Sequence, residues 1–558
     1  MAADPNRHFD AIVVGSGATG SIAVKELSER GLEVLLLEAG RDITPADFAA
    51  PTAPPRPRPM GINLWPRLKA GLRGQHVQSR RAFFSPSTNP FLVDDREHPY
   101  STPRGQYFLW IRGHMLGGRL NTYGRMLLRM SEFDFAGGDG RDRWPITYAD
   151  VEPWYERIEE LIGIYGNDDG IPTLPASRFV GPGYLTGVER HFKEKVEQHW
   201  PERKVISWRY AAPNPHRVPR GIVAARETGR LTTRTDAIVK RVVTDDRTGK
   251  ATGVVFVDRH SREERTATAD VVVLCASTIE SIRLLLNSAS SKHPNGLGNS
   301  SGLLGKYFMD QTPSLAFGSL PEHKGWEPDT TAPRDEFYPP AGGVYVPRWE
   351  NFGTRTNEAY TTGIAFQGAI GRMPVPDDSP GAFGLMGYGE MLPYRENSVT
   401  LHPAKTDKWG IPIPHITLTL HDNERALLRE QVRTAREMLE HAGFQVNFAG
   451  SSLGLDSKDV WPDADPFSRL MFRLNFKKSV AMGAAIHECG GARMGSDPAT
   501  SVLNEFNQSW DVPNLFVTDA SCYVSNGMVG PTLTIMALTA RACEYIAKEH
   551  AQGAGLAA

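Results

Sequence analysis

The feature that most constrains the fold is a glycine-rich loop between two apolar segments near the start of the chain. Phe9–Val14 is mostly apolar, and the loop Gly15-Ser16-Gly17-Ala18-Thr19-Gly20 follows at once. A helical pattern then runs to Arg30, and residues 33–37 are mostly apolar before Glu38. Glycines permit the tight turn, and the new helix offers unpaired N–H groups and a positive dipole end to a pyrophosphate. Glu38 ends the second strand, where a carboxylate binds a ribose hydroxyl. The segment therefore predicts a βαβ unit that binds a dinucleotide.

A second glycine-rich stretch, residues 112–124, reads RGHMLGGRLNTYG. Its glycines let the backbone approach something flat or phosphorylated, so the two loops together imply a large cofactor with two ends. Between them, residues 41–104 are rich in Pro, Arg and isolated aromatics, with little periodicity. We interpret this segment as an extended excursion or lid, and favour a solvated surface or subunit contact over a binding patch for its arginines.

The remaining chain returns twice to the first domain. Residues 270–276 form an apolar, β-branched run that feeds a helical pattern over 279–287, as expected for a buried parallel strand and its crossover. Residues 310–479 alternate strand-like stretches with Gly/Pro turns and one polar helix, which favours an antiparallel sheet. The predicted class is α/β: a discontinuous Rossmann-like domain with a second, mostly antiparallel (α+β) substrate domain. The predicted boundaries are 1–160 (first part, with the excursion 41–104), 161–224 (connector or substrate-domain segment), 225–309 (second part), 310–479 (substrate domain) and 480–558 (third part).

Composition excludes several classes of function. The chain has 62 Lys+Arg against 64 Asp+Glu, a formal net charge of −2, whereas nucleic-acid binding usually leaves a strongly basic domain. No apolar run approaches the ~18 residues that span a bilayer. The N-terminus, MAADPNRHFD, lacks a basic region followed by an apolar one, so we expect a cytoplasmic protein. Four cysteines in 558 residues form neither a disulfide framework nor a CxxC metal pair.

The carboxy-terminal segment holds the candidate chemistry. His487 lies in IHECGGARMG, and Gly530-Pro531-Thr532 opens a helix that runs to about His550. Taken alone, such a histidine is more often structural than catalytic. His487 and Cys489 have no further ligands at metal spacing, so no zinc site is expected.

These segments resemble, in order and over essentially the whole chain, the glucose–methanol–choline (GMC) family of flavin oxidoreductases. The matching motifs are GSGATGSIAVKELSERGLEVLLLEAG, RGHMLGGRLNTYG, DRWPITYADVEPWYERIEELIGIYG, ADVVVLCASTIESIRLLLNS, LGKYFMDQ, HECGGARMG and NLFVTDASCYVSNGMVGPTLTIMALTARACEYI. The resemblance implies bound FAD and oxidation of an alcohol by hydride transfer to the flavin. It makes His487 the general base that takes the hydroxyl proton.

The resemblance also assigns the cofactor contacts. It places the adenosine and pyrophosphate on the first loop and Glu38, and the adenine beside Val239. The residues it sets around the flavin and its ribityl-phosphate are Gly117, Gly118, Asn121, Thr122, Asp519, Ala520 and Thr532. Thr532 begins the final helix, whose positive end would stabilise the negative charge of a reduced flavin.

Departures from the family pattern concern the second catalytic residue and the cofactor linkage. Family members usually place His or Asn immediately before the final helix, where this chain has Gly530; the nearest candidate is Asn526, equally explicable as part of an Asn-Gly turn. Some relatives attach FAD through a histidine in the second glycine motif, where this chain reads Leu120-Asn121-Thr122-Tyr123. We therefore expect non-covalent FAD, with His114 the remaining histidine nearby.

HECGGARMG and GPTLTIMALTARA are most similar to the bacterial pyranose-oxidase-like and glucoside 3-dehydrogenase branch. This implies oxidation of a ring hydroxyl of a pyranose or glycoside, at the 3-position, to a keto-sugar. The alternatives are another polyol or an aminocyclitol as substrate, a nicotinamide enzyme, and a flavoprotein whose FAD is not redox-active. The electron acceptor, oxygen or another, stays open, as do a small partner subunit and a homo-oligomer.

Overall fold

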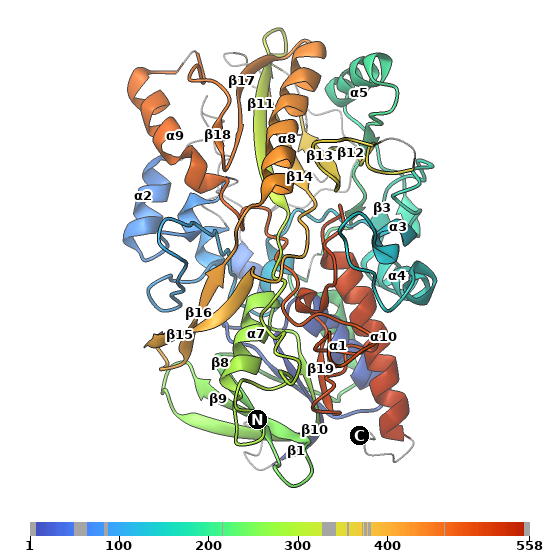
Figure 1. The fold of residues 1–558 in the computed structure, drawn as a ribbon, viewed down its shortest axis with the longest axis vertical. Helices are drawn as coiled ribbons and strands as arrows, with labels where there is room; N and C mark the ends of the chain where they lie inside the picture. Colours follow the sequence, from blue (N-terminus) through green and yellow to red (C-terminus); the bar gives the residue numbers. More distant parts are fainter. Residues whose placement is uncertain are drawn as a thin grey trace.

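In the computed structural model, two seven-stranded sheets lie at opposite ends of the long axis (Figure 1). The structure describes residues 7–48, 64–82, 88–214, 216–325, 342–353, 356–370, 372, 377, 381–462 and 464–551. The chain termini lie at the lower end of the view, beside the first sheet, and the second sheet stands above it.

The first sheet has the strand order β7-β2-β1-β10-β9-β8, with β19 paired to β10. Strands β1, β2, β7, β10 and β19 pair in parallel, whereas β8, β9 and β10 form an antiparallel meander. The end of β10 is apolar and buried because it lies inside the sheet, between β1 and β19. The strands are β1 (His8–Val14), β2 (Val34–Leu37), β7 (Leu231–Arg234), β8 (Ala237–Thr244), β9 (Ala251–Asp258), β10 (Glu264–Leu274) and β19 (Leu515–Val517).

Helices pack on this sheet in two groups. Helix α1 contacts α6 and α10, α10 also contacts α4, and α7 contacts β8. The α1 helix begins at Ala18, within the glycine loop, so its N-terminus stands at the carboxyl ends of β1 and β10. The bounds are α1 (Ala18–Glu29), α4 (Tyr148–Ile162), α6 (Arg220–Glu227), α7 (Thr278–Asn287) and α10 (Thr532–Ala551).

The second sheet is antiparallel, in the order β18-β17-β11-β14-β13-β12-β5. Helix α8 (Asp422–His441) covers β11, β14 and β17. The strands are β5 (Ile206–Ser207), β11 (Thr312–Leu320), β12 (Val344–Val346), β13 (Ile364–Ala369), β14 (Gly381–Gly389), β17 (Gln445–Ser451) and β18 (Gly454–Leu455).

Smaller elements complete the described chain. The pair β15 (Ser398–Thr406) and β16 (Pro412–Thr417) and the trio β3 (Ile164–Tyr165), β4 (Phe179–Gly181) and β6 (Tyr210–Ala211) form minor sheets. The other helices are α2 (Leu64–Leu72), α3 (Glu132–Ala136), α5 (Gly187–His199) and α9 (Pro466–Ser479). The 3-10 turns are η1 (Pro45–Phe48), η2 (Gln78–Arg80), η3 (Asn89–Phe91), η4 (Gly118–Asn121) and η5 (Ala520–Cys522).

The predicted fold class is confirmed. Three separate segments of the chain supply the first sheet, and residues 312–455 supply nearly all of the second. The domain boundaries themselves stay a prediction. Within the excursion, α2 is a helix that the weak periodicity did not indicate; residues 49–63 and 83–87 of that segment lie outside the described residues. None of the described helices is long and apolar enough to cross a membrane.

Candidate active site

The first glycine loop is closely packed at two positions and open at the third. A Cβ on Gly15 would lie 2.5 Å from the carbonyl oxygen of Cys275, and one on Gly20 would lie 1.8 Å from that of Gly15. By contrast, a Cβ on Gly17 would meet no heavy atom within 4 Å. The loop thus packs closely against Cys275, the residue after β10, and against itself at Gly20, and it leaves free space beside Gly17.

The N-terminus of α1 faces this space with unpaired donors. Gly17 is the N-cap residue and provides no side-chain cap, and the first amide to bond within the helix is that of Ser21, to the Gly17 carbonyl. The amides of residues 18–20 therefore have no partner inside the helix. Open space beside unpaired amides at a positive helix end fits a pyrophosphate, so the predicted FAD fits this loop.

The second glycine stretch meets the first. Gly117 (φ 89°) donates its amide to Ser16 Oγ at 2.8 Å, and a Cβ on Gly118 (φ 52°) would lie 3.4 Å from the Gly17 Cα. Asn121 Nδ2 bonds the Leu116 carbonyl and stabilises the η4 turn. The predicted residues of the two loops are thus brought together, with Thr122 directly after the turn.

Glu38 lies at the end of β2 and is buried. Its Oε1 accepts from the Gly40 amide at 2.7 Å, and its Oε2 accepts from the Ser16 amide at 3.1 Å. Burial raises the pKa of Glu38 above its ordinary value, against the lowering effect of these hydrogen bonds. The Ser16 hydroxyl also donates to Oε2, so the carboxylate links the first glycine loop to the turn at Gly40. Oε1 accepts one hydrogen bond and keeps a lone pair for a ribose hydroxyl.

Four other predicted cofactor contacts occupy separate elements. Val239 lies on β8, Ala520 begins η5, and Thr532 begins α10. Asp519 is buried, and its carboxylate accepts from the hydroxyls of Ser281 and Ser521. This side chain therefore ties η5 to α7, and the cofactor roles of these four residues stay predictions.

Gln311 determines the tautomer of His487. Gln311 Nε2 donates to the carbonyls of Gly527 and Val529, at 3.0 and 3.2 Å. Its Oε1 therefore faces His487 Nδ1, at 2.6 Å. Because an amide oxygen only accepts, Nδ1 carries the proton and Nε2 keeps a lone pair. A neutral imidazole in this tautomer can accept a proton at Nε2.

The backbone of His487 is held by Asp310. Asp310 Oδ1 accepts from the His487 amide at 3.1 Å, and Oδ2 accepts from the Gly483 amide at 2.7 Å. Burial, with the nearby charge of Glu488, raises the pKa of Asp310. Ile486 has a φ of 61°, a strained conformation for a β-branched residue that surrounding contacts must maintain. Asp310 supplies one such contact, and sequence reasoning had not singled it out.

Electrostatics keep His487 neutral. Burial, with the positive charge of Arg119, lowers the pKa of His487 to about 3. Arg119 in turn pairs with Glu488 at 3.3 Å. At neutral pH the side chain is therefore an unprotonated base.

Gly530 lies directly opposite the basic nitrogen. A Cβ on Gly530 would stand 3.1 Å from His487 Nε2. The structure thus places the predicted second position beside the base, but glycine has no hydrogen-bonding side chain, and even a methyl group there would crowd the imidazole. Any polar partner for a bound substrate oxygen must come from another residue.

Hydrogen bonds fix the loop that carries Asn526, whereas the side chain of Asn526 itself has no partner among the described residues. Trp144 bonds Ser525 Oγ at 2.9 Å, Gln311 bonds the carbonyls of Gly527 and Val529, and Tyr345 bonds that of Met528. Asn526 is 1% exposed, yet among the described residues neither its Oδ1 nor its Nδ2 has a hydrogen-bond partner. A buried amide without partners in a fixed loop indicates a ligand group beside it.

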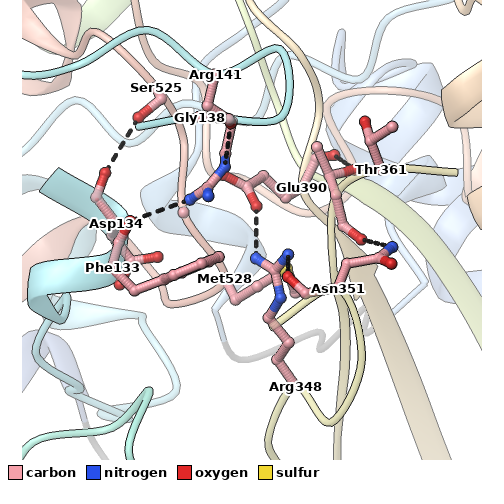
Figure 2. Close-up of polar contacts among 12 residues, drawn as sticks. Phe133, Asp134, Gly138, Arg141, Arg348, Asn351, Thr361, Glu390, Ser525 and Met528 are labelled. Carbon is pink, nitrogen blue, oxygen red and sulfur yellow. Dashed lines mark hydrogen bonds and ion pairs between the residues drawn. The ribbon is translucent and has the colours of Figure 1, made fainter. Parts of the chain in front are cut away.

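A buried charge cluster adjoins this loop (Figure 2). Arg348 bonds Glu390 Oε2 at 3.1 Å, and the Ser525 hydroxyl reaches the Asp134 carbonyl. Glu390 Oε1 is buried and has no partner among the described residues. Burial, and next the charge of Glu390, raises the pKa of Asp134.

Strand β14 carries Tyr388, and Glu390 follows directly after the strand. Tyr388 stacks on the His487 ring, with ring centres 5.3 Å apart, and residues two apart on a strand face the same side. Glu390 lies just past the end of β14, and its charge acts on Asp134 beside the Asn526 loop. From sequence, Glu390 was one of several polar side chains of the second domain that could recognise a sugar, each equally explicable as surface or strand chemistry.

His114 lies at the other end of the cofactor site. A Cβ on Gly40 would stand 1.9 Å from the His114 carbonyl carbon, which places His114 beside the Glu38–Gly40 turn. Its ring contacts His98, with centres 4.3 Å apart. Burial and Arg112 lower the pKa of His114 to about 3. The resemblance places the adenosine at this end of the site, so non-covalent FAD stays the prediction.

Fold and site together define a flavin oxidoreductase with a Rossmann-like domain. Models of the GMC oxidoreductase family match residues 9–312 with the N-terminal part and residues 393–539 with the C-terminal part. The chain belongs to the GMC oxidoreductase family, and its cofactor is FAD. It is an oxidoreductase that acts on alcohol groups.

Relatives and solved structures agree with this family. The chain is 28% identical to 2-methyl-1,2-propanediol dehydrogenase of Mycolicibacterium austroafricanum, over 97% of this chain and 95% of that protein. It is 25% identical to C-glycoside 3-oxidase of Microbacterium trichothecenolyticum, over 56% and 53% of the two chains. The crystal structure of pyridoxine 4-oxidase from Mesorbium loti has the same fold, with a TM-score of 0.62, 18% identity, and coverage of 96% and 98%.

Proposed function

We propose that the protein oxidises a secondary ring hydroxyl of a pyranose sugar or glycoside, at the 3-position, to a keto-sugar. The observation that carries this proposal is the fixed tautomer of His487, which leaves Nε2, beside Gly530, as the basic nitrogen. Bound FAD supplies the acceptor for the hydride that leaves the hydroxyl-bearing carbon. The hydroxyl proton passes to His487 Nε2, so the carbon–oxygen bond becomes a carbonyl.

The other residues orient the substrate. Asn526 donates through Nδ2 to the substrate oxygen, a hydrogen bond that opposes the negative charge developing there. Glu390 Oε1 accepts from a neighbouring hydroxyl, because a buried carboxylate oxygen without a partner is satisfied best by a donor. A substrate with several adjacent hydroxyl groups meets both requirements.

Two relatives support this substrate class. One is named as an oxidase of C-glycosides at the 3-position, and the other as a dehydrogenase of a 1,2-diol. Both act on hydroxyl groups that have oxygen-bearing neighbours. Another polyol or an aminocyclitol is the second candidate, since Asp134 and Glu390 place two carboxylates beside one Arg348 in the same cluster.

The test is anaerobic reduction of the FAD-loaded enzyme by a panel of pyranoses, glycosides, diols and aminocyclitols. Pyranoses or glycosides should bleach the visible flavin absorbance, and NMR of the product should show a carbonyl at C3. Bleaching by diols or aminocyclitols alone would replace the sugar assignment, and bleaching by no alcohol would overturn the reaction itself.

Substitutions test whether His487 acts as a general base or has only a structural role. His487→Ala should retain FAD and lose about 10²- to 10⁴-fold in the rate of flavin reduction, because a general base contributes about that factor. The matched control is His260→Ala, at a surface histidine whose side chain is 77% exposed and which should keep the wild-type rate. Asn526→Ala should slow reduction as well; an unchanged rate would return Asn526 to a purely structural role.

A further inference from the structure

Two short helices expose apolar stripes to solvent. On α2 the exposed side chains are Trp65, Leu68 and Leu72, and on α9 they are Phe467, Leu470 and Leu474, with exposed fractions from 50% to 84%. Each set has the spacing i, i+3, i+7, which places its members on one face of a helix. In the described part of the chain, these six are most of the eight large hydrophobic side chains that remain exposed. The concentration on two helices is therefore not the ordinary scatter of surface apolar residues.

The same two helices carry only positive charge. Residues 64–73 and 466–479 contain no Asp or Glu, although the whole chain has a net charge of −2. Lys69 and Arg73 are exposed beside the α2 stripe, and Arg473 and Lys477 beside the α9 stripe. An apolar face with cationic flanks and no acid is the pattern of helices that lie in a membrane interface.

Both helices lie on one side of the molecule (Figure 1). Helix α9 lies above α2 along the left side of the view. The segment 107–110 connects them: Lys478 of α9 stands 5.2 Å from the ring of Tyr107, and Gln78, in the turn after α2, bonds the Trp110 carbonyl. Tyr107 is itself exposed and adds an aromatic ring between the helices.

We propose that this surface, formed by the α2 and α9 stripes with their flanking Lys and Arg residues, docks the enzyme on an anionic phospholipid bilayer. The apolar side chains enter the boundary between headgroups and acyl chains, and the cations contact the phosphates. At 9 and 14 residues, neither helix is long enough to span, so the enzyme lies on the membrane.

The charges argue against a second copy as the occupant. A two-fold interface places the same patch on both subunits. It would bring Lys69, Arg73, Arg473 and Lys477 of one subunit toward the same cations of the other, with no acid on either helix to pair with them. Anionic lipid supplies the missing negative charge along the whole surface.

Vesicle flotation with the FAD-loaded, full-length protein tests the proposal. The enzyme should float with phosphatidylcholine vesicles that contain phosphatidylglycerol, and much less with phosphatidylcholine alone. High salt should weaken flotation, because it screens the cation–phosphate attraction. Wild-type protein that stays in the buffer fraction at every lipid composition overturns the proposal.

Variants locate the contact. Leu470→Gln with Leu474→Gln should reduce vesicle binding at least about tenfold while flavin content and melting temperature stay unchanged, since both side chains are exposed. Arg473→Gln with Lys477→Gln should remove the preference for phosphatidylglycerol. The matched control is Val180→Gln, an exposed apolar residue on β4, which should bind like wild type.

Two results would overturn the assignment. Undiminished flotation of the leucine variant would show that another surface binds lipid. A wild-type dimer in light scattering that the leucine variant converts to monomer would identify the surface as a contact between protein chains.

Discussion

Three residues around His487 each contribute to keeping its imidazole able to accept a proton. Gln311 orients the ring, Asp310 holds the backbone amide, and Arg119 contributes a positive charge that disfavours protonation. Gln311 reaches His487 and the Asn526 loop with the same amide group. The base and its proposed partner are therefore positioned by a common residue.

The pH dependence of flavin reduction follows from the lowered pKa. His487, with a pKa of about 3, stays in its basic form from neutral pH down to well below 6.5. The rate of anaerobic reduction by substrate should therefore stay flat between about pH 7 and 5, whereas a histidine with its ordinary pKa of about 6.5 would lose activity there. Stopped-flow absorbance over this range gives the rate.

Gln311→Glu provides the contrasting variant. A carboxylate beside Nδ1 favours the protonated imidazole and raises its pKa, so the rate should fall as pH decreases within this range. Flavin content and melting temperature check that the loop survives the change. A wild-type rate that already falls through pH 6.5 would contradict the electrostatic reading.

At the level of elements, the cofactor site depends on how α1 starts. The loop from β1 to α1 needs glycine for two different reasons: Gly20 has no space for a side chain, and Gly17 faces open space beside the unpaired amides. Only the second reason concerns the cofactor directly. The two glycines should therefore respond differently to the same substitution.

Gly17→Ala should leave the fold intact and weaken FAD binding. Its φ of −68° suits alanine, and no protein atom lies near the new methyl, which enters the space that fits the pyrophosphate. Gly20→Ala should instead destabilise the fold, because its methyl would lie 1.8 Å from the Gly15 carbonyl oxygen. Bound flavin per protein and circular dichroism of the two purified variants separate these outcomes. Equal flavin content in Gly17→Ala and wild type would contradict the assignment of the pyrophosphate to the space beside Gly17.

At the level of the whole molecule, the site assembles from distant parts of the chain. The first helix supplies the phosphate end, the carboxy-terminal segment supplies His487 and Asn526, and the second sheet supplies Tyr388. Strand β19 pairs with β10 in the first sheet, which carries the chain back to the N-terminal unit just before the Asn526 loop. The residues of the candidate active site are therefore held in place by the same buried contacts that stabilise the fold.

Buried histidines should make global stability sensitive to acid. Burial lowers the pKa of His114 to about 3, below the value of about 6.5 expected in the unfolded chain. Below pH 6.5 His114 binds a proton in the unfolded chain but stays unprotonated in the folded protein. The contribution of His114 to the free energy of unfolding therefore decreases as pH falls. His114→Leu removes it.

The measurement compares the free energy of unfolding of wild type and His114→Leu, both loaded with FAD, between about pH 6 and 4. The wild-type slope should exceed that of the variant by up to ~1.4 kcal/mol per pH unit, the value for one proton. Identical slopes would show that His114 titrates normally in the folded protein.

The sequence by itself determined the parts that depend on local pattern. A loop such as GSGATG between apolar runs has few stable conformations, so the βαβ unit, the dinucleotide and Glu38 at its strand end were predictable. The ordered motifs identified the family and His487. The helix at 64–72 was missed because its apolar stripe faces solvent and lies in a segment rich in Pro and Arg.

Only the tertiary structure decided how the candidate residues meet. The tautomer of His487 depends on Gln311, which is 176 residues away in the chain, and the orientation of that amide depends on two carbonyls of a third segment. Tyr388 stacks on the imidazole from β14, which pairs with β11, and Gly530 lies beside Nε2 just before α10 begins. Such contacts arise from packing between remote segments, which local sequence patterns do not encode, so the proton-accepting geometry is a property of the folded chain.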